Sequence, residues 1–287
     1  MTKMSDTPNI IRVNSLSSSL LDPYVRLTGA QMRSRLEPER AIFIAESPTV
    51  IDVALDAGCT PISFLCDEKL INGDVKRIIG RLCDYPSADG TGVPIYVGDG
   101  ELLRSITGFE LTRGALCEMR RPEPRTAEDV LTGARRVAVL EEIADSTNVG
   151  AIFRSAAALG IDAVLLTPTC CDPLSRRAVR VSMGTALLIP FARIGDGQNW
   201  QKSGIPLLHS LGFTTVAMAL TDNSVSINDE SLKNAERLAI ILGTEGTGLK
   251  PETIDAADLT VKIPMTRGVD SLNVGAAAAI AFFAIRD

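Results

Sequence analysis

Three segments in the second half of the chain combine amide, carboxylate, guanidinium and glycine groups at spacings that could build one reactive site. The first, DSTNVGAIFR, runs from Asp145 to Arg154, where an apolar strand passes into a helix. In parallel α/β sheets this carboxyl edge is where ligands bind. Asn148 is a good helix cap, and Gly150 and Ala151 allow another backbone or a ligand to come close. Taken alone, the segment also fits a capped helix that carries one surface arginine.

The second segment, LGTEGTGLKP, is a glycine-rich loop that follows an apolar strand and runs from Leu242 to Pro251. A phosphate-binding loop needs Lys and then Ser or Thr directly after its last glycine, whereas Leu249 follows Gly248 here. The order of the glycines also differs from the dinucleotide fingerprint. Glu245 would repel phosphate and would suit a cationic or hydroxyl-bearing ligand. A plain glycine turn is the alternative.

The third segment, IPMTRGVDSLNV, runs from Ile263 to Val274 and joins the end of a strand to an alanine-rich helix. Ser271 can cap that helix. Gly275 and the alanines after it allow the helix to pack very close to other backbone segments. The alternative is a tightly packed terminal helix with no further role.

In this order, the three segments resemble the SpoU (TrmH-like) branch of the SPOUT RNA methyltransferases. The family motifs are Asn-x-Gly-Ala-x-x-Arg, Gly-x-Glu-Gly-x-Gly-Leu and Ile-Pro-Met followed by Ser-Leu-Asn-Val, and all three are present. The resemblance covers roughly residues 134–287. The sequence from Phe43 to Glu46 more weakly resembles the small N-terminal domain of many members. Thr147, Gly275 and Ser47 depart from the family pattern, at positions where Pro, Ser and Gly are frequent.

The resemblance implies an α/β fold in which residues 134–287 form a trefoil-knotted methyltransferase domain with a parallel sheet. It implies S-adenosylmethionine as cofactor, methyl transfer to a ribose 2′-OH, and a homodimer formed through the C-terminal domain. We expect structured RNA as substrate, ribosomal RNA rather than transfer RNA, by analogy with family members that carry such an N-terminal domain. Two alternatives stay open: an RNA-binding relative that has lost catalysis, and a related enzyme that methylates a base.

The same resemblance assigns site residues. Arg154 takes the central catalytic role; because guanidinium stays protonated, we expect it to hold the target phosphate and stabilise a developing alkoxide. Asn148 and Glu245 would orient Arg154 and the ribose, and Asn273 would fix the loops. The cofactor would be bound by Leu242, Gly243, Thr244, Ile263, Met265, Ser271 and Leu272.

A short basic run, SRRAVR, predicts the RNA contacts. Arg176 and Arg180 are four residues apart and therefore share one helical face, and Arg177 lies beside them. We expect all three to bind phosphate close to Arg154. The alternative, a solvated helix face, is common for such runs.

Hydrophobic patterning places these segments on alternating strands and helices, which predicts α/β domains. We expect a flexible leader over residues 1–22, a small α/β substrate-binding domain over 23–120, a Pro-rich linker over 121–133 and the methyltransferase domain over 134–287. The predicted strands are 41–45, 61–66, 93–97, 137–143, 163–166, 187–191, 214–219, 238–242 and 259–263. The predicted helices are 31–40, one that begins after Ser47 and ends at Gly58, 74–82, 148–159, 174–181 and 271–285.

Composition narrows the function class. The 287 residues are 45% hydrophobic and carry a net charge of −6, which argues against non-specific coating of nucleic acid. Six cysteines without a CxxC pair and a single histidine predict reduced thiols and no metal site. The N-terminus lacks the apolar core of a signal peptide, and the longest apolar stretch, 274–285, is too short to span a bilayer. We expect a cytoplasmic protein without a membrane partner.

Overall fold

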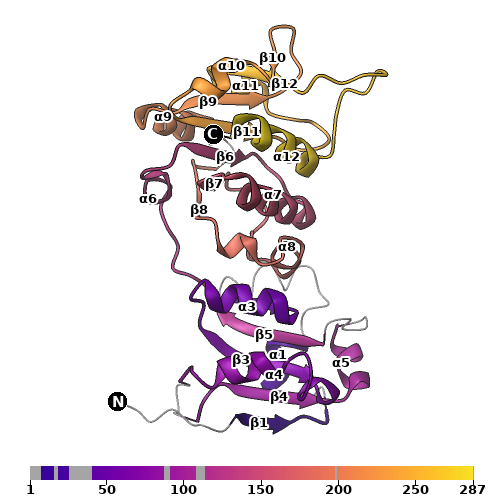
Figure 1. The fold of residues 1–287 in the computed structure, drawn as a ribbon. Coiled ribbons are helices and arrows are strands. Elements are labelled where there is room, and N and C mark those ends of the chain that lie inside the picture. Colours follow the sequence, from indigo (N-terminus) through magenta and orange to yellow (C-terminus); the bar gives the residue numbers. More distant parts are fainter. Residues whose placement is uncertain are drawn as a thin grey trace. The chain divides into compact units, whose positions relative to one another are not determined.

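The computed structural model describes residues 8–15, 19–25, 41–86, 91–107, 114–197 and 199–286. The chain divides into two compact units, each of α/β type (Figure 1). Unit 1 comprises Met1–Pro122 together with Leu174–Leu187, and unit 2 comprises Glu123–Pro173 and Leu188–Asp287. The segment 174–187, expected within the methyltransferase domain, therefore groups with the N-terminal part of the chain.

The described part of unit 1 is built on a mixed five-stranded sheet. Its strands, in spatial order, are β1 (Asn9–Arg12), β4 (Pro94–Gly98), β3 (Pro61–Asp67), β5 (Ala115–Arg120) and β2 (Ile42–Glu46). β5 runs antiparallel to both of its neighbours, and the other pairs are parallel. The three strands predicted from apolar runs, β2, β3 and β4, are confirmed within a residue or two.

Short helices cover this sheet. They are α1 (Asp22–Val25), α3 (Pro48–Asp56), α4 (Lys76–Leu82), α5 (Gly100–Thr107) and α8 (Arg176–Val181). A buried cluster that includes Tyr24 of α1, Leu103 of α5 and Leu65 of β3 fills one side of the sheet. α3 packs against α4 and β2, and α8 also packs against β2.

The N-terminal segment differs from the expected flexible leader. Residues 9–12 form the edge strand β1, paired in parallel with β4, and a 3-10 turn at Ser19–Leu21 leads into α1. Leu21 and Tyr24 are fully buried. The helix expected at 31–40 lies outside the described residues.

Ser47 keeps a backbone conformation that glycine normally supplies. Its φ and ψ are 89° and 148°, a region that is almost restricted to glycine. The serine is nevertheless useful, because its Oγ accepts a hydrogen bond from the amide of Val50 and caps α3. The departure from the family pattern at this position therefore changes the residue and leaves the turn in place.

The described part of unit 2 contains a seven-stranded sheet in which every neighbouring pair is parallel. The strands of its centre, β6 and β11, are buried along their whole length, as expected for a sheet covered on both faces. Across the sheet the order is β10 (Val225–Ser226), β12 (Leu259–Lys262), β9 (Thr214–Met218), β11 (Leu238–Leu242), β6 (Arg136–Leu140), β7 (Ala163–Leu166) and β8 (Phe191–Arg193).

Two layers of helices cover this sheet. α7 (Ser146–Leu159) and α12 (Val274–Ile285) pack against each other, side by side in Figure 1. A buried cluster on the sheet joins the side chains of α6 (Ala127–Leu131), α9 (Gln201–Ser210) and α11 (Pro251–Ala256). The short α10 (Glu230–Asn234) contacts α12. No helix among the described residues is long and apolar enough to cross a membrane.

Several predicted boundaries were wrong in detail. α7 begins two residues before Asn148, and its cap is Asp145, whose carboxylate accepts from the amide of Thr147. α12 is capped by Asn273, not by Ser271. The strand expected at 187–191 is a 3-10 turn at Thr185–Leu187 followed by β8. The expected linker 121–133 contains the helix α6. The six cysteines are all free thiols.

Candidate active site

The three motif segments meet at one edge of the unit 2 sheet. They follow the carboxyl ends of β6, β11 and β12, respectively. β11 lies between β6 and β9, although the chain forms β7, β8, β9 and β10 before it reaches β11. The strand order therefore reverses beside β6, and this kind of reversal is where open α/β sheets bind ligands.

Asn273 joins the three motifs. Its amide Nδ2 donates to Oδ1 of Asn148, 3.0 Å away, and to the carboxylate of Glu245. Its Oδ1 accepts from the amides of Gly275 at 3.0 Å and Ala276 at 3.3 Å, which caps α12. One side chain thus fixes the start of α12 and ties the first helix turn of α7 to the glycine-rich loop.

The glycine-rich loop doubles back on itself. The amides and carbonyls of Thr244 and Gly248 bond to each other at 3.2 and 3.1 Å. A Cβ on Gly243 would lie 2.5 Å from the carbonyl oxygen of Gly248 and 2.5 Å from the amide nitrogen of Leu249. Because these neighbours are backbone atoms, only glycine fits at position 243 without a shift of the loop.

The second close approach joins α12 to α7. A Cβ on Gly275 would lie 3.0 Å from Cβ of Ala151 and 3.1 Å from Oδ1 of Asn273. Small residues on both helices therefore allow the contact, as the sequence suggested. A larger residue at 275 would push α12 away from the asparagine that caps it.

Among the described residues, no hydrogen bond joins Arg154 to the group formed by Asn148, Glu245 and Asn273. It lies six residues after Asn148 on α7, about 9 Å along the helix axis at 1.5 Å per residue. Its side chain is exposed. Within the described part of the chain, no hydrogen bond or ion pair occupies its guanidinium, so the cation is available to a ligand.

The predicted cofactor residues line the same edge with different exposure. Leu242 and Gly243 are buried, whereas Thr244, Ile263 and Met265 are half-buried. Ser271 is exposed and its hydroxyl donates to Asp270 at 3.2 Å. Leu272 is 38% exposed, which is unusual for a large apolar side chain held between two motif residues.

The family model described as the SpoU rRNA Methylase family matches residues 135–283, just over half of the chain. This chain belongs to the SpoU methylase family. The match starts one residue before β6 and ends within α12, so it covers the sheet edge described above. The chain is therefore a member of an RNA methyltransferase family.

Curated relatives of this SpoU methylase extend the likeness to nearly the whole chain. An uncharacterised tRNA/rRNA methyltransferase of Mycobacterium tuberculosis is 40% identical over 92% of this chain and 87% of its own length. The 23S rRNA guanosine 2′-O-methyltransferase RlmP of Bacillus subtilis is 28% identical over 75% of this chain and 82% of its own.

Solved structures share the fold. An AdoMet-bound rRNA methyltransferase from Sinorhizobium meliloti superposes with a TM-score of 0.79 at 23% identity, over 96% of this chain and 97% of that one. The SpoU methyltransferase AviRb from Streptomyces viridochromogenes, in complex with AdoMet, has a TM-score of 0.74 at 18% identity, over 93% and 97% of the two chains.

α8, the helix that carries the basic run SRRAVR, is less exposed than its sequence suggests. Arg176 was expected on a face open to RNA, but it is only 6% exposed and its Nε donates to Glu46 at 2.9 Å. Arg180 contacts the same carboxylate at 3.4 Å. Positions i and i+4 do share a face, as predicted, but that face packs on β2. Arg177 is exposed, and Arg180 is 43% exposed.

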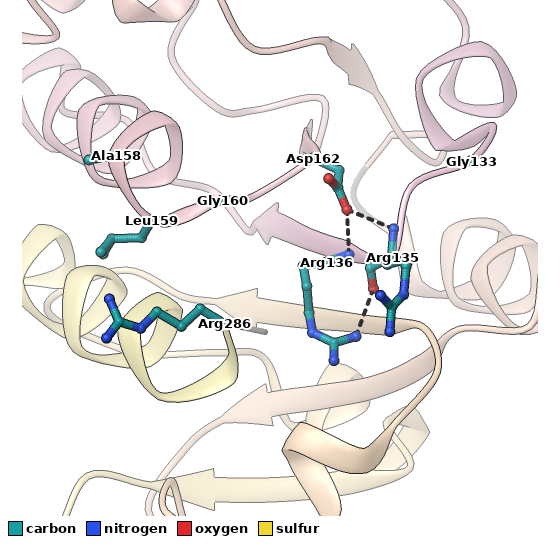
Figure 2. A pocket seen from close by; sticks show the side chains of 8 residues that line it. All are labelled: Gly133, Arg135, Arg136, Ala158, Leu159, Gly160, Asp162 and Arg286. Atoms are coloured by element: carbon teal, nitrogen blue, oxygen red, sulfur yellow. Dashed lines mark hydrogen bonds between the residues drawn. The ribbon is translucent and has the colours of Figure 1, made fainter.

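A hollow of about 380 Å³ lies at the opposite edge of the unit 2 sheet (Figure 2). Beside it, Arg136 begins β6, is 2% exposed, and donates to the carbonyls of Ile285, Ala235 and Lys233 at 2.9 to 3.1 Å. These carbonyls belong to the ends of α12 and α10, where a cation compensates the helix dipole. Arg136 thus holds helix ends together, away from the motif edge.

Sequence reasoning missed two residues at the motif edge. Glu141, directly after β6, is 1% exposed and accepts three hydrogen bonds. Leu220, two residues after β9, is 59% exposed. The sequence did contain an indication for Glu141. It is one of two glutamates directly after a buried apolar strand, and a buried carboxylate needs hydrogen-bond donors from neighbouring residues. Leu220 carries no comparable signal.

Proposed function

We propose that this chain is an S-adenosylmethionine-dependent methyltransferase that modifies a ribose 2′-OH of ribosomal RNA in the cytoplasm. The observation that carries the proposal is the bridge from Asn273 to Asn148 and Glu245, which brings the three family motifs into one hydrogen-bonded group. The Bacillus subtilis relative, a 23S rRNA guanosine 2′-O-methyltransferase, supports the choice of ribose over base.

The residues at the motif edge fit the cofactor. S-adenosylmethionine, when bound, supplies a methyl group on a sulfonium. The loop from Gly243 to Gly248 turns backbone amides and carbonyls toward each other and leaves Glu245 exposed, as a cationic ligand requires. Leu220, two residues after β9, and Val269 and Leu272, in the loop between β12 and α12, are large apolar side chains that are 59, 53 and 38% exposed. They supply the apolar walls that a purine ring needs.

The catalytic roles follow from charge and from bonding partners. Arg154, exposed and without a protein partner in the described part of the chain, binds the phosphate next to the target ribose and stabilises negative charge as it develops on the 2′-oxygen. Glu245 accepts from Asn273 through one oxygen and keeps its other oxygen for the ribose. Asn148 and Asn273 hold this arrangement, so little reorganisation is needed during the reaction.

A homodimer explains why Arg154 stands apart from the other three residues. α12 exposes Ile280 and Phe283 by 40 and 55%, and the guanidinium of Arg286 stacks 3.9 Å from the ring centre of Phe283. A second copy that covers these residues would bury an apolar face which water now meets. In such a dimer, Arg154 of one subunit would serve the site of the other.

Unit 1 is the proposed RNA-binding unit. Arg177 and Arg180, both exposed on α8, provide the phosphate contacts, and Arg176 holds α8 on β2 through Glu46.

We also propose that the C-terminal region is threaded as a trefoil knot. Support comes from β11, which inserts between β6 and β9 after the chain has passed through four other strands. Gly243 comes close to the backbone of Gly248 and Leu249, and Gly275 of α12 comes close to the side chains of Ala151 on α7 and Asn273. A threaded chain needs such thin crossings.

The test uses the chemistry of the ribose. Ribosomal RNA from cells that lack this protein is incubated with the purified chain and S-adenosylmethionine labelled in its methyl group, and is then hydrolysed in alkali. Alkali cleaves RNA only next to a free 2′-OH, so the label should appear in dinucleotides that resist cleavage. Label in single nucleotides would mean base methylation and would overturn the proposal.

Two matched variants distinguish the catalytic role of Arg154 from a general loss of one positive charge on the protein. Arg154→Ala should lower turnover by at least about a hundredfold, as expected for the loss of one charge-stabilising group. Lys202→Ala removes an exposed cation on α9 and should leave turnover unchanged. Binding of both RNA and S-adenosylmethionine without any transfer by the wild-type chain would identify a catalytically inactive relative.

A further inference from the structure

A buried carboxylate lies directly behind the glycine-rich loop. Glu141, the first residue after β6, is 1% exposed, and no lysine or arginine forms an ion pair with it within the described ranges. Its carboxylate accepts from the indole Nε1 of Trp200 at 2.6 Å, from the amide of Lys250 at 2.7 Å and from the hydroxyl of Thr253. A buried charge is costly unless donors surround it, so three donors from separate segments are a built arrangement.

The same residue holds both ends of the glycine-rich loop. The loop leaves β11 at Leu242, whose carbonyl accepts from the amide of Glu141 at 2.8 Å. It reaches α11 at Lys250, whose amide is bound by the Glu141 side chain. The backbone of Glu141 therefore fixes one end of the loop and its carboxylate fixes the other.

The closed shape of the loop depends on how far apart Glu141 holds its two ends, Leu242 and Lys250. The Gly243 and Gly248 backbones come so close that a Cβ on Gly243 has no room, and Thr244 pairs with Gly248. If residue 250 moved outward, these contacts would open. Thr244 and Glu245 would then lose their positions relative to Asn273.

The neighbouring acid offers a contrast. Glu142 also binds Lys250, through an ion pair of 2.6 Å between its Oε1 and the ammonium. Both side chains are about one-third exposed, 29 and 33%. Pairs so open to water contribute little. Two adjacent glutamates thus bind the same residue, one in the protein interior and one at its surface.

We propose that Glu141 is a positioning residue for S-adenosylmethionine: it clamps the glycine-rich loop, residues 243–249, in the shape that binds the cofactor, without touching cofactor or RNA. The proposal rests on the proposed function, in which this loop holds the cofactor. Replacement by glutamine leaves one acceptor oxygen for donors that now use two, so at least one donor loses its partner. The two donors on Oε2, from Trp200 and Thr253, compete with the Lys250 amide for the single oxygen.

The experiment measures binding of S-adenosylmethionine by isothermal titration calorimetry to the full chain and to two matched variants. Glu141→Gln should weaken binding about tenfold to hundredfold, the effect of one lost buried hydrogen bond to a charged group. Glu142→Gln, which removes only the surface pair, should stay within about threefold of wild type. In turnover assays, Glu141→Gln should raise KM for S-adenosylmethionine and leave KM for RNA unchanged, a split that general loss of structure would not give.

A second pair of variants covers the case in which Glu141→Gln fails to fold. Lys250 has φ of −63°, which proline adopts, so Lys250→Pro deletes the amide that Glu141 binds, and Lys250→Ala deletes only the ammonium. The clamp predicts weaker cofactor binding for the proline variant than for the alanine variant. Equal affinities within each pair would overturn the clamp, whereas absence of binding by the wild-type chain would overturn the proposed function instead.

Discussion

Replacement of Ser47 by glycine should stabilise this protein, although it removes a helix cap. The observed φ of 89° and ψ of 148° lie in a region where a non-glycine residue stores about 1–3 kcal/mol of strain. Glycine relieves that strain. Two smaller terms oppose the gain: loss of the Oγ bond to Val50, which at 3.5 Å is long, costs a few tenths of a kcal/mol for Ser→Gly, and the greater freedom of glycine in the unfolded chain costs about 0.4–1 kcal/mol. The net expectation is a gain of about 1 kcal/mol.

Urea unfolding followed by circular dichroism measures this gain. With a slope of about 2 kcal/mol per molar urea, the midpoint of Ser47→Gly should rise by about 0.5 M. Ser47→Ala is the matched control, since alanine keeps the strain and loses the cap, and should lower stability by about 1 kcal/mol. If glycine and alanine destabilise the protein equally, the strain argument is wrong and the cap alone determines the effect.

Three further expectations follow from the site and the surface. Asn273→Asp keeps an N-cap acceptor but loses the two amide donors, so turnover should fall about tenfold to hundredfold in a methyl-transfer assay while the melting temperature changes little. Phe283→Asp should disrupt the proposed homodimer: light scattering should give a dimer mass for the wild-type chain and a monomer mass for the variant, and equal masses would refute the proposed α12 interface. The unfolding free energy should decrease as the pH falls below about 4. Burial raises the pKa of Asp258, but the hydrogen bonds from Thr215 and the charge of His209 outweigh burial, so the pKa in the folded protein is lowered. The ionised carboxylate therefore stabilises the fold at higher pH, and this stabilisation is lost as Asp258 becomes protonated. Asp258→Asn should show a smaller decrease over the same range.

The central fold was predictable because its strands are short continuous apolar runs. β6, β7 and β11 are buried throughout, and apolar runs of only four or five residues favour strands over helices. β1 was missed because its sequence, NIIR, alternates half-buried and exposed residues at a sheet edge and resembles a polar leader. Its pairing with β4, some 85 residues away, is a tertiary contact that local pattern does not contain.

The site was predictable at the level of which segments meet, and less so in its details. The motifs placed Asn148, Glu245 and Asn273 after the predicted strands 137–143, 238–242 and 259–263. In the sheet, β11 lies next to β6, and β9 separates β11 from β12. The cap of α12 was assigned to Ser271 because serine and asparagine are almost equal as caps, and the choice between them depends on the path of the loop after β12. Burial of Arg176 depends on Glu46, 130 residues earlier, so its helix resembled a free basic face.

The assignment of α8 to unit 1 has a consequence for how this protein can be divided. The chain passes between the two units three times, near residues 122, 173 and 187. A gene cut at residue 122 would therefore not yield two intact pieces, because the second piece would carry Ala178 and Val179, both fully buried here, without the strand that covers them. A recombinant that takes its N-terminal half from a relative would therefore have to keep the surface of β2 against which α8 packs.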